Sequence, residues 1–351
     1  MGEVFAGRYE LLDPVAVGGM GTVWCVLDRA DHQVKAAKIL RQSDAASLLR
    51  FVREQSMRID HSHVVTPQSW AGMDDRVLFT MPLVRGGSVS QLLKAYGVLP
   101  PRWTALLVDQ TLQALEAVHA AGIIHRDVKP ANLLLEPTGR GMPHLRLTDF
   151  GIAIPLDEPR MTRTSMIVGS PGYMAPEQWR GADPDERADI YSVGRVGIQM
   201  LTGLRPPAED ADVDLSAYRT GDAGHDALLD LFDRAVSREP AGRPASAAAM
   251  RAELRALDLT SRPPEPGESI TVVDTFGDLA TVGSPTPATA AMTATVGATG
   301  LPAGKRDGSP ADATRVQPVP SSAGRGSPLP GIVLIVVGVL SIVAALVLLL
   351  A

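Results

Sequence analysis

The chain is 351 residues long and carries a formal net charge of −6 at pH 7. This acidic balance gives no electrostatic reason to expect nucleic acid as a partner. The single cysteine, Cys25, excludes an internal disulfide and a cysteine-based metal site, and it is consistent with a reducing compartment. We expect no secretory signal peptide, because residues 1–4 lead directly into the first predicted strand.

The first predicted elements are two short strands, residues 10–12 and 23–27, that enclose a glycine-rich turn. The turn reads Val15-Ala16-Val17-Gly18-Gly19-Met20-Gly21-Thr22-Val23. Glycines let a backbone approach phosphate groups closely, although such a turn alone is a weak signal. The next predicted strand, residues 34–40, carries Lys35 and Lys38, which strand alternation places on opposite faces.

Three further segments lead to the centre of the chain. Glu54 is the only glutamate between Glu10 and Glu116. An apolar run ends at Met81 and is followed by Pro82-Leu83-Val84 and then by Arg85-Gly86-Gly87. Residues 101–121 predict a long helix that ends at Gly122, with an apolar stripe in which His119 is a packed residue rather than a ligand.

The most informative segment is residues 125–132, His-Arg-Asp-Val-Lys-Pro-Ala-Asn, followed seventeen residues later by Asp149-Phe150-Gly151. It supplies an acid that can take a hydroxyl proton, a lysine for a phosphate, and oxygen ligands of the kind that Mg²⁺ prefers. A lone Asp after Arg is normally a solvated loop residue, but this order and spacing is improbable by accident.

Together these motifs resemble those of the protein kinase family, and more closely its bacterial serine/threonine members, from residue 8 to about residue 258. The resemblance implies an α+β fold of two lobes, a small β-rich one over about residues 8–84 and a larger helical one over about residues 85–258. It also implies ATP, Mg²⁺ with Mn²⁺ as an alternative metal, and proteins with Ser or Thr as substrates, since Lys129 is typical of that class.

The resemblance assigns roles residue by residue. Asp127 would accept the substrate proton, Lys129 would contact the γ-phosphate, and Lys38, paired with Glu54, would contact the α- and β-phosphates, while Lys35 would be solvated. Asn132 and Asp149 would hold the metal. The nucleotide would also contact Val15, Ala16, Gly18, Gly19, Gly21, Val23, Ala36, Met81, Pro82 and Val84.

Two positions depart from the family pattern. Ala16 replaces the first glycine of the loop, which is tolerable if its φ is negative. Pro82 stands where many relatives carry Glu, but proline keeps the carbonyl that the adenine amino group uses, and Val84 still offers its N–H.

Residues 149–177 correspond to the activation segment, and Thr162, Thr164 and Ser165 are its phosphorylation candidates, which would pair with Arg126. Ser170 lies in the expected substrate-binding turn. Structural roles are expected for His125, for Asp189 and for an ion pair between Glu177 and Arg243. Arg195 stands on a helix that we expect to be buried, and the sequence gives no physical account of it.

Residues 259–330 are rich in Pro, Gly, Ser, Thr and Ala, and we predict a disordered linker there. One apolar cluster, residues 269–276, is a candidate short binding motif. Its Thr271 and Thr275 are further phosphorylation candidates, and a phosphothreonine-reading protein is a candidate partner at the linker.

Residues 331–351 are continuously apolar apart from Ser341 and are long enough to cross a bilayer as a helix. Basic residues precede this stretch, which predicts a single-pass anchor in the cell membrane with the kinase domain in the cytoplasm. We expect no sensor domain after it. Ser341 and Ala345 form a small-residue pair, which is weak evidence for self-association.

The sequence therefore predicts a membrane-anchored serine/threonine protein kinase that phosphorylates itself. The first alternative is a nucleotide-binding pseudokinase scaffold at the membrane, favoured only by Ala16 and Pro82. The second is a kinase-like enzyme acting on small molecules, which Ala175-Pro176-Glu177 and the substrate turn disfavour.

Overall fold

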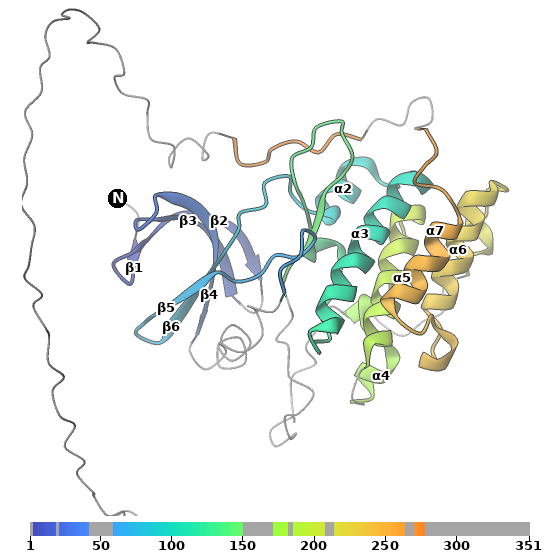
Figure 1. Cartoon of the computed structure of the whole chain (residues 1–351), viewed down its shortest axis with the longest axis horizontal. Coiled ribbons are helices and arrows are strands. Elements are labelled where there is room, and N and C mark those ends of the chain that lie inside the picture. The colour runs from blue at the N-terminus through green and yellow to red at the C-terminus, as the bar shows by residue number, and fades with distance from the viewer. Residues whose placement is uncertain are drawn as a thin grey trace, which may run out of the picture. The chain divides into compact units, whose positions relative to one another are not determined.

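The computed structural model describes residues 3–18, 21–41, 59–149, 171–181, 185–207, 214–263 and 270–277 (Figure 1). The chain divides into two units, Met1–Ala288 and Thr289–Ala351, and the second lies wholly outside the described residues. Within the first unit a β-sheet forms one lobe and a group of helices forms the other (Figure 1).

The N-terminal lobe is built on a sheet of six antiparallel strands among the described residues, in the order β1-β2-β3-β4-β6-β5. Strand alternation divides the sheet into two faces. In β6, Val77 and Phe79 point into the main core of the molecule, whereas Leu78 joins a separate apolar cluster with Phe5 and Tyr9. The strands are β1 (Val4–Phe5), β2 (Tyr9–Gly18), β3 (Gly21–Asp28), β4 (Gln33–Arg41), β5 (Ser69–Met73) and β6 (Arg76–Met81).

The C-terminal lobe consists of helices and a small two-stranded hairpin. Polar side chains begin several of the helices, because their oxygens accept from free backbone N–H groups: Ser88, Asp185, Asp222 and Ser246 each do so. The helices are α2 (Val89–Tyr96), α3 (Pro101–Ala120), α4 (Pro176–Trp179), α5 (Glu186–Thr202), α6 (Ala223–Ala235) and α7 (Ala247–Ala256), and the hairpin pairs β7 (Leu133–Leu135) with β8 (Leu145–Leu147).

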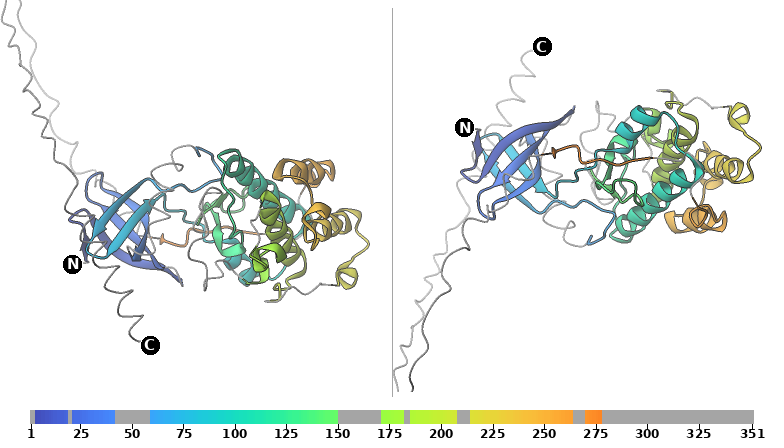
Figure 2. Two further views of the ribbon diagram at one scale, coloured as in Figure 1. Left: turned by 90° about the horizontal axis from the view of Figure 1, so that it is seen from below. Right: turned by 90° about the horizontal axis from the view of Figure 1, so that it is seen from above.

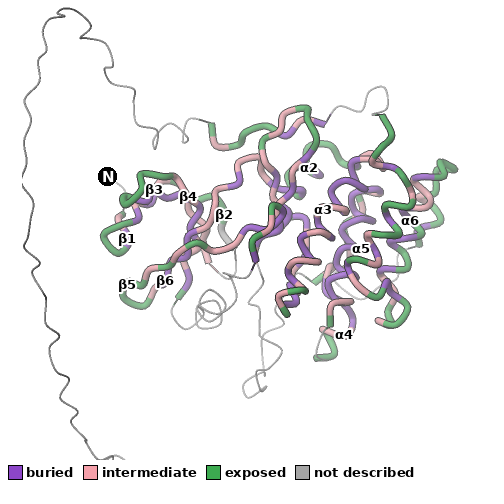
Figure 3. The backbone as a smooth tube through the Cα atoms, viewed as in Figure 1, coloured by how far each residue is buried: buried purple, intermediate pink, exposed green. Residues whose placement is uncertain are grey.

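Helix α5 is the centre of this lobe. All its residues from Ala188 to Leu201 are buried, and Figure 3 shows it enclosed by its neighbours. A helix that is covered on every side serves as a core element rather than a surface one. Short 3-10 turns complete the lobe at Pro130–Asn132, Pro171–Tyr173, Ser216–Tyr218 and Pro240–Gly242.

The structure agrees with the two predicted lobes and with the long helix, which is α3, ending before Gly122 at φ 75°. It differs from the predicted linker, residues 259–330, in two places. Leu259 is buried in the main core. Residues 270–277 pack against the folded domain that precedes them, and Ile270 and Val272 belong to its main core, so they are not disordered. No helix within the described ranges is long and apolar enough to span a bilayer. The predicted anchor, residues 331–351, lies outside those ranges.

Candidate active site

The hairpin of β7 and β8 brings two predicted metal ligands to one end. Leu133 pairs with Leu147 in antiparallel register, so Asn132, before β7, and Asp149, after β8, meet at the same edge. The Thr148 N–H donates to the Asn132 carbonyl at 2.9 Å and closes this end of the hairpin. The fold therefore collects oxygen ligands that are separated in the sequence.

The Asp127 carboxylate is held by two predicted site residues. Its Oδ2 accepts a hydrogen bond from Lys129 Nζ at 2.7 Å and another from Asn132 Nδ2 at 3.0 Å. Asn132 Nδ2 also donates to the Asp127 carbonyl at 2.8 Å. The Asp127 side chain is 15% exposed, which leaves it accessible yet fixed in direction. A carboxylate fixed in this way can orient a hydroxyl group and accept its proton.

Asp189, on α5, organises the backbone of this loop. Its Oδ2 accepts from the His125 N–H and its Oδ1 from the Arg126 N–H, both at 2.8 Å. Arg126 has φ 67° and Asp149 has φ 56°, a left-handed conformation that is costly for residues with a Cβ. Such conformations persist where neighbouring contacts over-determine them, and here Asp189 supplies those contacts at Arg126.

Two histidines complete the support around Asp189. His119 on α3 lies with Nε2 2.8 Å from Asp189 Oδ2, a contact that the sequence reading missed when it treated His119 as simple packing. Burial alone would raise the pKa of Asp189, but hydrogen bonding and charge from His119 lower it overall, so the buried carboxylate stays ionised.

His125 has the structural role that we predicted. Burial lowers its pKa, which favours the neutral ring. The ring Nε2 donates to the Thr148 carbonyl at 3.1 Å, and Nδ1 accepts from the Asp127 N–H at 3.3 Å. This histidine therefore ties the loop that carries Asp127 to the segment that leads into Asp149.

Lys38 and Lys35 leave β4 in opposite directions, as the alternation predicted. Lys38 Nζ lies 2.7 Å from Asp149 Oδ1 and so joins the sheet to the catalytic end of the hairpin. The expectation that Lys35 is solvated is wrong. Its Nζ lies 2.7 Å from Asp28 Oδ2 and 2.5 Å from Asp31 Oδ2, and Asp28 is fully buried.

The glycine-rich turn joins β2 and β3, with Gly18 opposite Gly21 in the register. Gly21 has φ 136°, and a Cβ there would come within 2.5 Å of the Ile39 carbonyl, so only glycine fits. Ala16 pairs with Val23 inside the ladder and is not among the described residues with positive φ. The extra methyl at Ala16 therefore causes no backbone strain.

The segment that joins the two lobes, Met81 to Val84, is called the hinge and begins at the last residue of β6. Ala36 pairs with Met81 across β4 and β6, and Ala36 is 8% exposed. This pairing brings the expected adenine contact, Ala36, next to the first residue of the hinge. Val84 follows and is buried.

Glu177 and Arg243 form the ion pair that we predicted. The guanidinium donates twice, from Nη1 to Oε1 at 2.7 Å and from Nη2 to Oε2 at 2.8 Å. Arg243 also lies over the Tyr191 ring, 5.0 Å from its centroid. Because a bidentate pair fixes both partners, it anchors the end of the activation segment to the C-terminal lobe.

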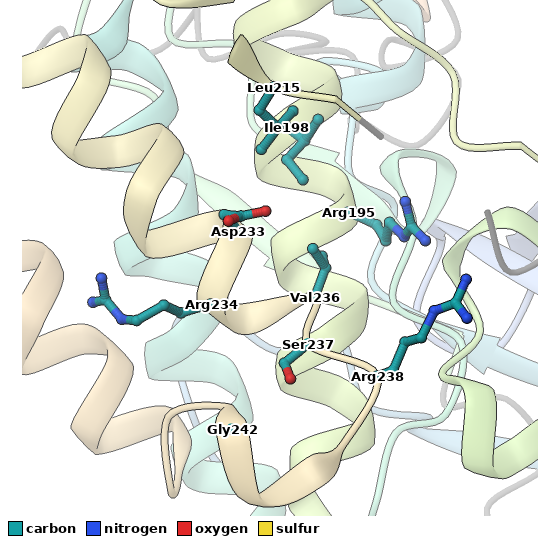
Figure 4. Close-up of a pocket in the computed structure, with 9 residues that line it drawn as sticks. All are labelled: Arg195, Ile198, Leu215, Asp233, Arg234, Val236, Ser237, Arg238 and Gly242. Atoms are coloured by element: carbon teal, nitrogen blue, oxygen red, sulfur yellow. The ribbon is translucent and has the colours of Figure 1, made fainter. Parts of the chain in front are cut away.

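Arg195, which the sequence left unexplained, binds Tyr191. Its Nε and Nη2 donate to the Tyr191 hydroxyl at 2.9 and 2.6 Å. It also lines a cavity of about 410 Å³ between α5 and α6 (Figure 4). In this view Arg195 and Arg238 lie on one side, while Arg234 points away from them. The cavity is separate from the residues predicted to bind nucleotide.

Several predicted residues lie outside the described ranges, namely Gly19, Glu54, Thr162, Thr164, Ser165 and Ser170. The expected pairing of Lys38 with Glu54 and the phosphorylation of the activation segment therefore stay predictions. Among the described positions, Asn132 and Asp149 fit a divalent cation, since an amide and a carboxylate supply oxygen ligands of the kind such a cation prefers, and the register of β7 and β8 places the two residues at one end of the hairpin.

The sequence model of the protein kinase domain matches residues 9–251. The chain belongs to the protein kinase family. Curated relatives include bacterial serine/threonine-protein kinases. They include pkn3 of Myxococcus xanthus, 34% identical over 75% of this chain and 52% of the relative. PknA of Mycobacterium tuberculosis is 32% identical over 77% of this chain and 65% of the relative. PkaA of Streptomyces coelicolor is 36% identical over 68% of this chain and 48% of the relative.

The chain spans about half to two thirds of the length of the curated relatives it matches.

Proposed function

We propose that this chain transfers the γ-phosphoryl group of ATP to serine and threonine hydroxyls of proteins. The observation that carries the proposal is the Asp127 carboxylate, oriented by Lys129 at 2.7 Å and by Asn132 at 3.0 Å. A positioned carboxylate beside a lysine is suited to a hydroxyl nucleophile and an anionic phosphoryl group.

Each of the described site residues has a different role in this reaction. Asp127 orients the substrate hydroxyl and takes its proton, while Lys129 neutralises charge on the transferred group. Lys38 aligns the other phosphates from the sheet side, next to Asp149. Asn132 and Asp149 would hold Mg²⁺, which supplies charge neutralisation between the phosphates. The partners are protein substrates.

The departures at Ala16 and Pro82 do not favour the pseudokinase alternative. Ala16 takes an ordinary strand position, and Pro82 keeps its carbonyl for adenine. We further propose that the enzyme phosphorylates its own activation segment at Thr162 or Thr164, through contact between two copies of the chain.

Location is the third part of the proposal. Residues 331–351 are apolar apart from Ser341, and basic residues precede them. These features support a single-pass membrane anchor with the kinase domain on the cytoplasmic side.

One experiment tests the catalytic proposal. The full chain in detergent is incubated with labelled ATP, Mg²⁺ and a protein substrate, beside Asp127→Asn as its inactive control. We expect the native chain to transfer phosphate to serine and threonine and Asp127→Asn to transfer none. Nucleotide binding without transfer would instead support a pseudokinase scaffold.

A further inference from the structure

Residues 270–277, here called the C-terminal strap, lie against the kinase domain after α7 has ended. In both views of Figure 2 the strap, drawn in orange, extends between the two lobes. Val272 donates to and accepts from Gly139, at 2.8 and 2.9 Å, in the turn between β7 and β8. Ile270 and Val272 are 5% and 2% exposed, so the strap is attached through its apolar residues.

The second attachment is Arg85, the residue that follows Val84 at the end of the hinge. The Arg85 carbonyl accepts from both the N–H and the Oγ1 of Thr275, each at 2.8 Å. Its guanidinium lies 2.6 Å from Asp274 Oδ2. The strap therefore binds the chain immediately next to the expected adenine contact.

The neighbouring surface is shaped for an extended peptide. A Cβ on Gly86 would come within 2.7 Å of Val272 Cγ1, so glycine lets the strap approach closely. Tyr96, at the end of α2, accepts from the Thr271 N–H at 3.0 Å. Ordering an extended segment costs chain entropy, which offsets part of the stabilisation from these contacts, and local opening of such a segment does not require the rest of the domain to unfold.

We propose that Thr275 is a phosphorylation site whose modification detaches the C-terminal strap from the hinge. This rests on the phosphoryl-transfer activity proposed above. Thr275 Oγ1 donates to the Arg85 carbonyl when the strap is docked. A phosphoryl group would replace that proton with about two negative charges, directed at a carbonyl oxygen and next to Asp274. Docking and phosphorylation at Thr275 therefore exclude each other.

The reaction itself is the ordinary one for this family. In the detached strap, Thr275 Oγ attacks the γ-phosphorus of ATP and forms the new P–O bond. The bond to the β,γ-bridging oxygen breaks, and ADP leaves with that electron pair. The hydroxyl proton passes to the Asp127 carboxylate. Since the docked hydroxyl is engaged with Arg85, the rate should follow the detached fraction of strap.

A matched pair of variants in the full chain tests this. Val272→Asp places a charge at the buried strap residue, and Val273→Asp places the same charge at a neighbour that is 60% exposed. Each is incubated with ATP and Mg²⁺, and the initial rate of Thr275 phosphorylation is measured by mass spectrometry. We expect a rise of roughly tenfold for Val272→Asp and a change within about twofold for Val273→Asp. Asp274→Ala, which removes the ion pair to Arg85 and the hydrogen bond that Asp274 Oδ1 accepts from the Phe276 N–H, should raise the rate in the same direction.

A second measurement does not depend on activity. Amide hydrogen exchange at Val272 and Thr275 should accelerate in Thr275→Glu and stay unchanged in Thr275→Ser, which keeps the hydroxyl donor. Equal protection in both variants would overturn the proposal. So would an absence of phosphate on Thr275 in Val272→Asp and Asp274→Ala enzymes that still phosphorylate an added protein substrate. Failure on every substrate would instead contradict the proposed function.

Discussion

At the scale of single residues, the two lysines of β4 show how one strand serves two purposes. Lys38 meets Asp149 at the catalytic end of the hairpin, and Lys35 meets the buried Asp28 on the other side of the sheet. Hydrogen bonds from Arg8, and then from Lys35, lower the pKa of Asp28 and keep it charged although it is buried. One lysine is placed for chemistry and the other for stability.

The first prediction separates these roles. Lys38→Met should reduce phosphoryl transfer by at least about a hundredfold, because phosphate alignment is lost. Lys35→Met should keep most of the activity but lower the free energy of unfolding by about 1–2 kcal/mol, since a hydrogen bond to a buried carboxylate is lost. Kinase assays and denaturant titrations measure both variants. An inactive Lys35→Met beside an active Lys38→Met would reverse the assignment of this strand.

The second prediction concerns His63, which is 8% exposed and bonds the Leu145 carbonyl through Nδ1 at 2.7 Å. Burial lowers its pKa below the ordinary value of 6.5. The unfolded chain therefore takes up the proton first as the pH falls. The stability tied to His63 is complete above about pH 6.5 and is lost progressively below it.

The thermal unfolding midpoint of the native protein should accordingly decrease from pH 7.5 to pH 5, values set by the ordinary histidine pKa of about 6.5. His63→Asn keeps a donor near the position of Nδ1 but removes the titration, so its midpoint should depend less steeply on pH. His61 and His144, the ring neighbours of His63, are present in both proteins. An identical pH dependence in the two proteins would exclude His63 as the cause.

At the scale of elements, α5 connects the core to the catalytic loop. Asp189 projects from its first turn and binds His119 of α3 together with the N–H groups of His125 and Arg126. Further along α5, Tyr191 contacts both Arg195 and Arg243. The helix therefore fixes the loop that carries Asp127 and the end of the activation segment at once.

The third prediction follows from Asp189. Asp189→Asn would direct an NH₂ group at buried donors and leave at least one of them unsatisfied, which should lower stability by about 1–3 kcal/mol. Because the loop carrying Asp127 loses its support, kcat should fall more than the KM for ATP changes. Asp230→Asn, on the exposed surface of α6, is the matched control and should be close to native in both measurements. A variant that loses stability with native kcat would limit Asp189 to the fold.

At the scale of the whole molecule, the main core is continuous from the sheet to the strap. Phe79 of β6, the helices of the C-terminal lobe and Val272 of the strap belong to one apolar cluster. The catalytic unit therefore includes residues that composition alone assigned to a linker. The apolar stretch at residues 331–351 belongs to the second unit of the chain.

The fourth prediction concerns the apolar stretch at residues 331–351. Removing residues 331–351 should move the protein from the membrane fraction to the soluble fraction, because the apolar stretch is lost. Its catalytic rate on a protein substrate should stay within about twofold, because the described site residues all lie in the first unit of the chain. Fractionation and kinase assays of the two forms decide this. A truncated form that stays in the membrane fraction, or full-length protein that is soluble, would contradict the proposed anchor.

The sequence by itself determined the family and indicated the two lobes, and it supplied the candidate site residues, because phosphoryl transfer requires fixed residue types at fixed spacing around residues 125–132 and 149. It also predicted the pair of Glu177 and Arg243 correctly. These features could be predicted because they are either local sequence motifs or positions that the family resemblance assigns.

Only the tertiary structure decided the partners of Lys35, His119 and Arg195, and the place of residues 270–277. His119 contacts the Asp189 side chain and Thr275 bonds the Arg85 carbonyl, which lie 70 and 190 residues away in the sequence. Lys35 and Arg195 contact Asp28 and Tyr191, which are only seven and four residues away, so there the fold decides which of several nearby polar side chains lies opposite. Composition predicted a disordered linker over residues 259–330, with residues 269–276 as its one apolar cluster and a candidate binding motif. The C-terminal lobe supplies the missing apolar surface to Ile270 and Val272, and no local pattern contains that information.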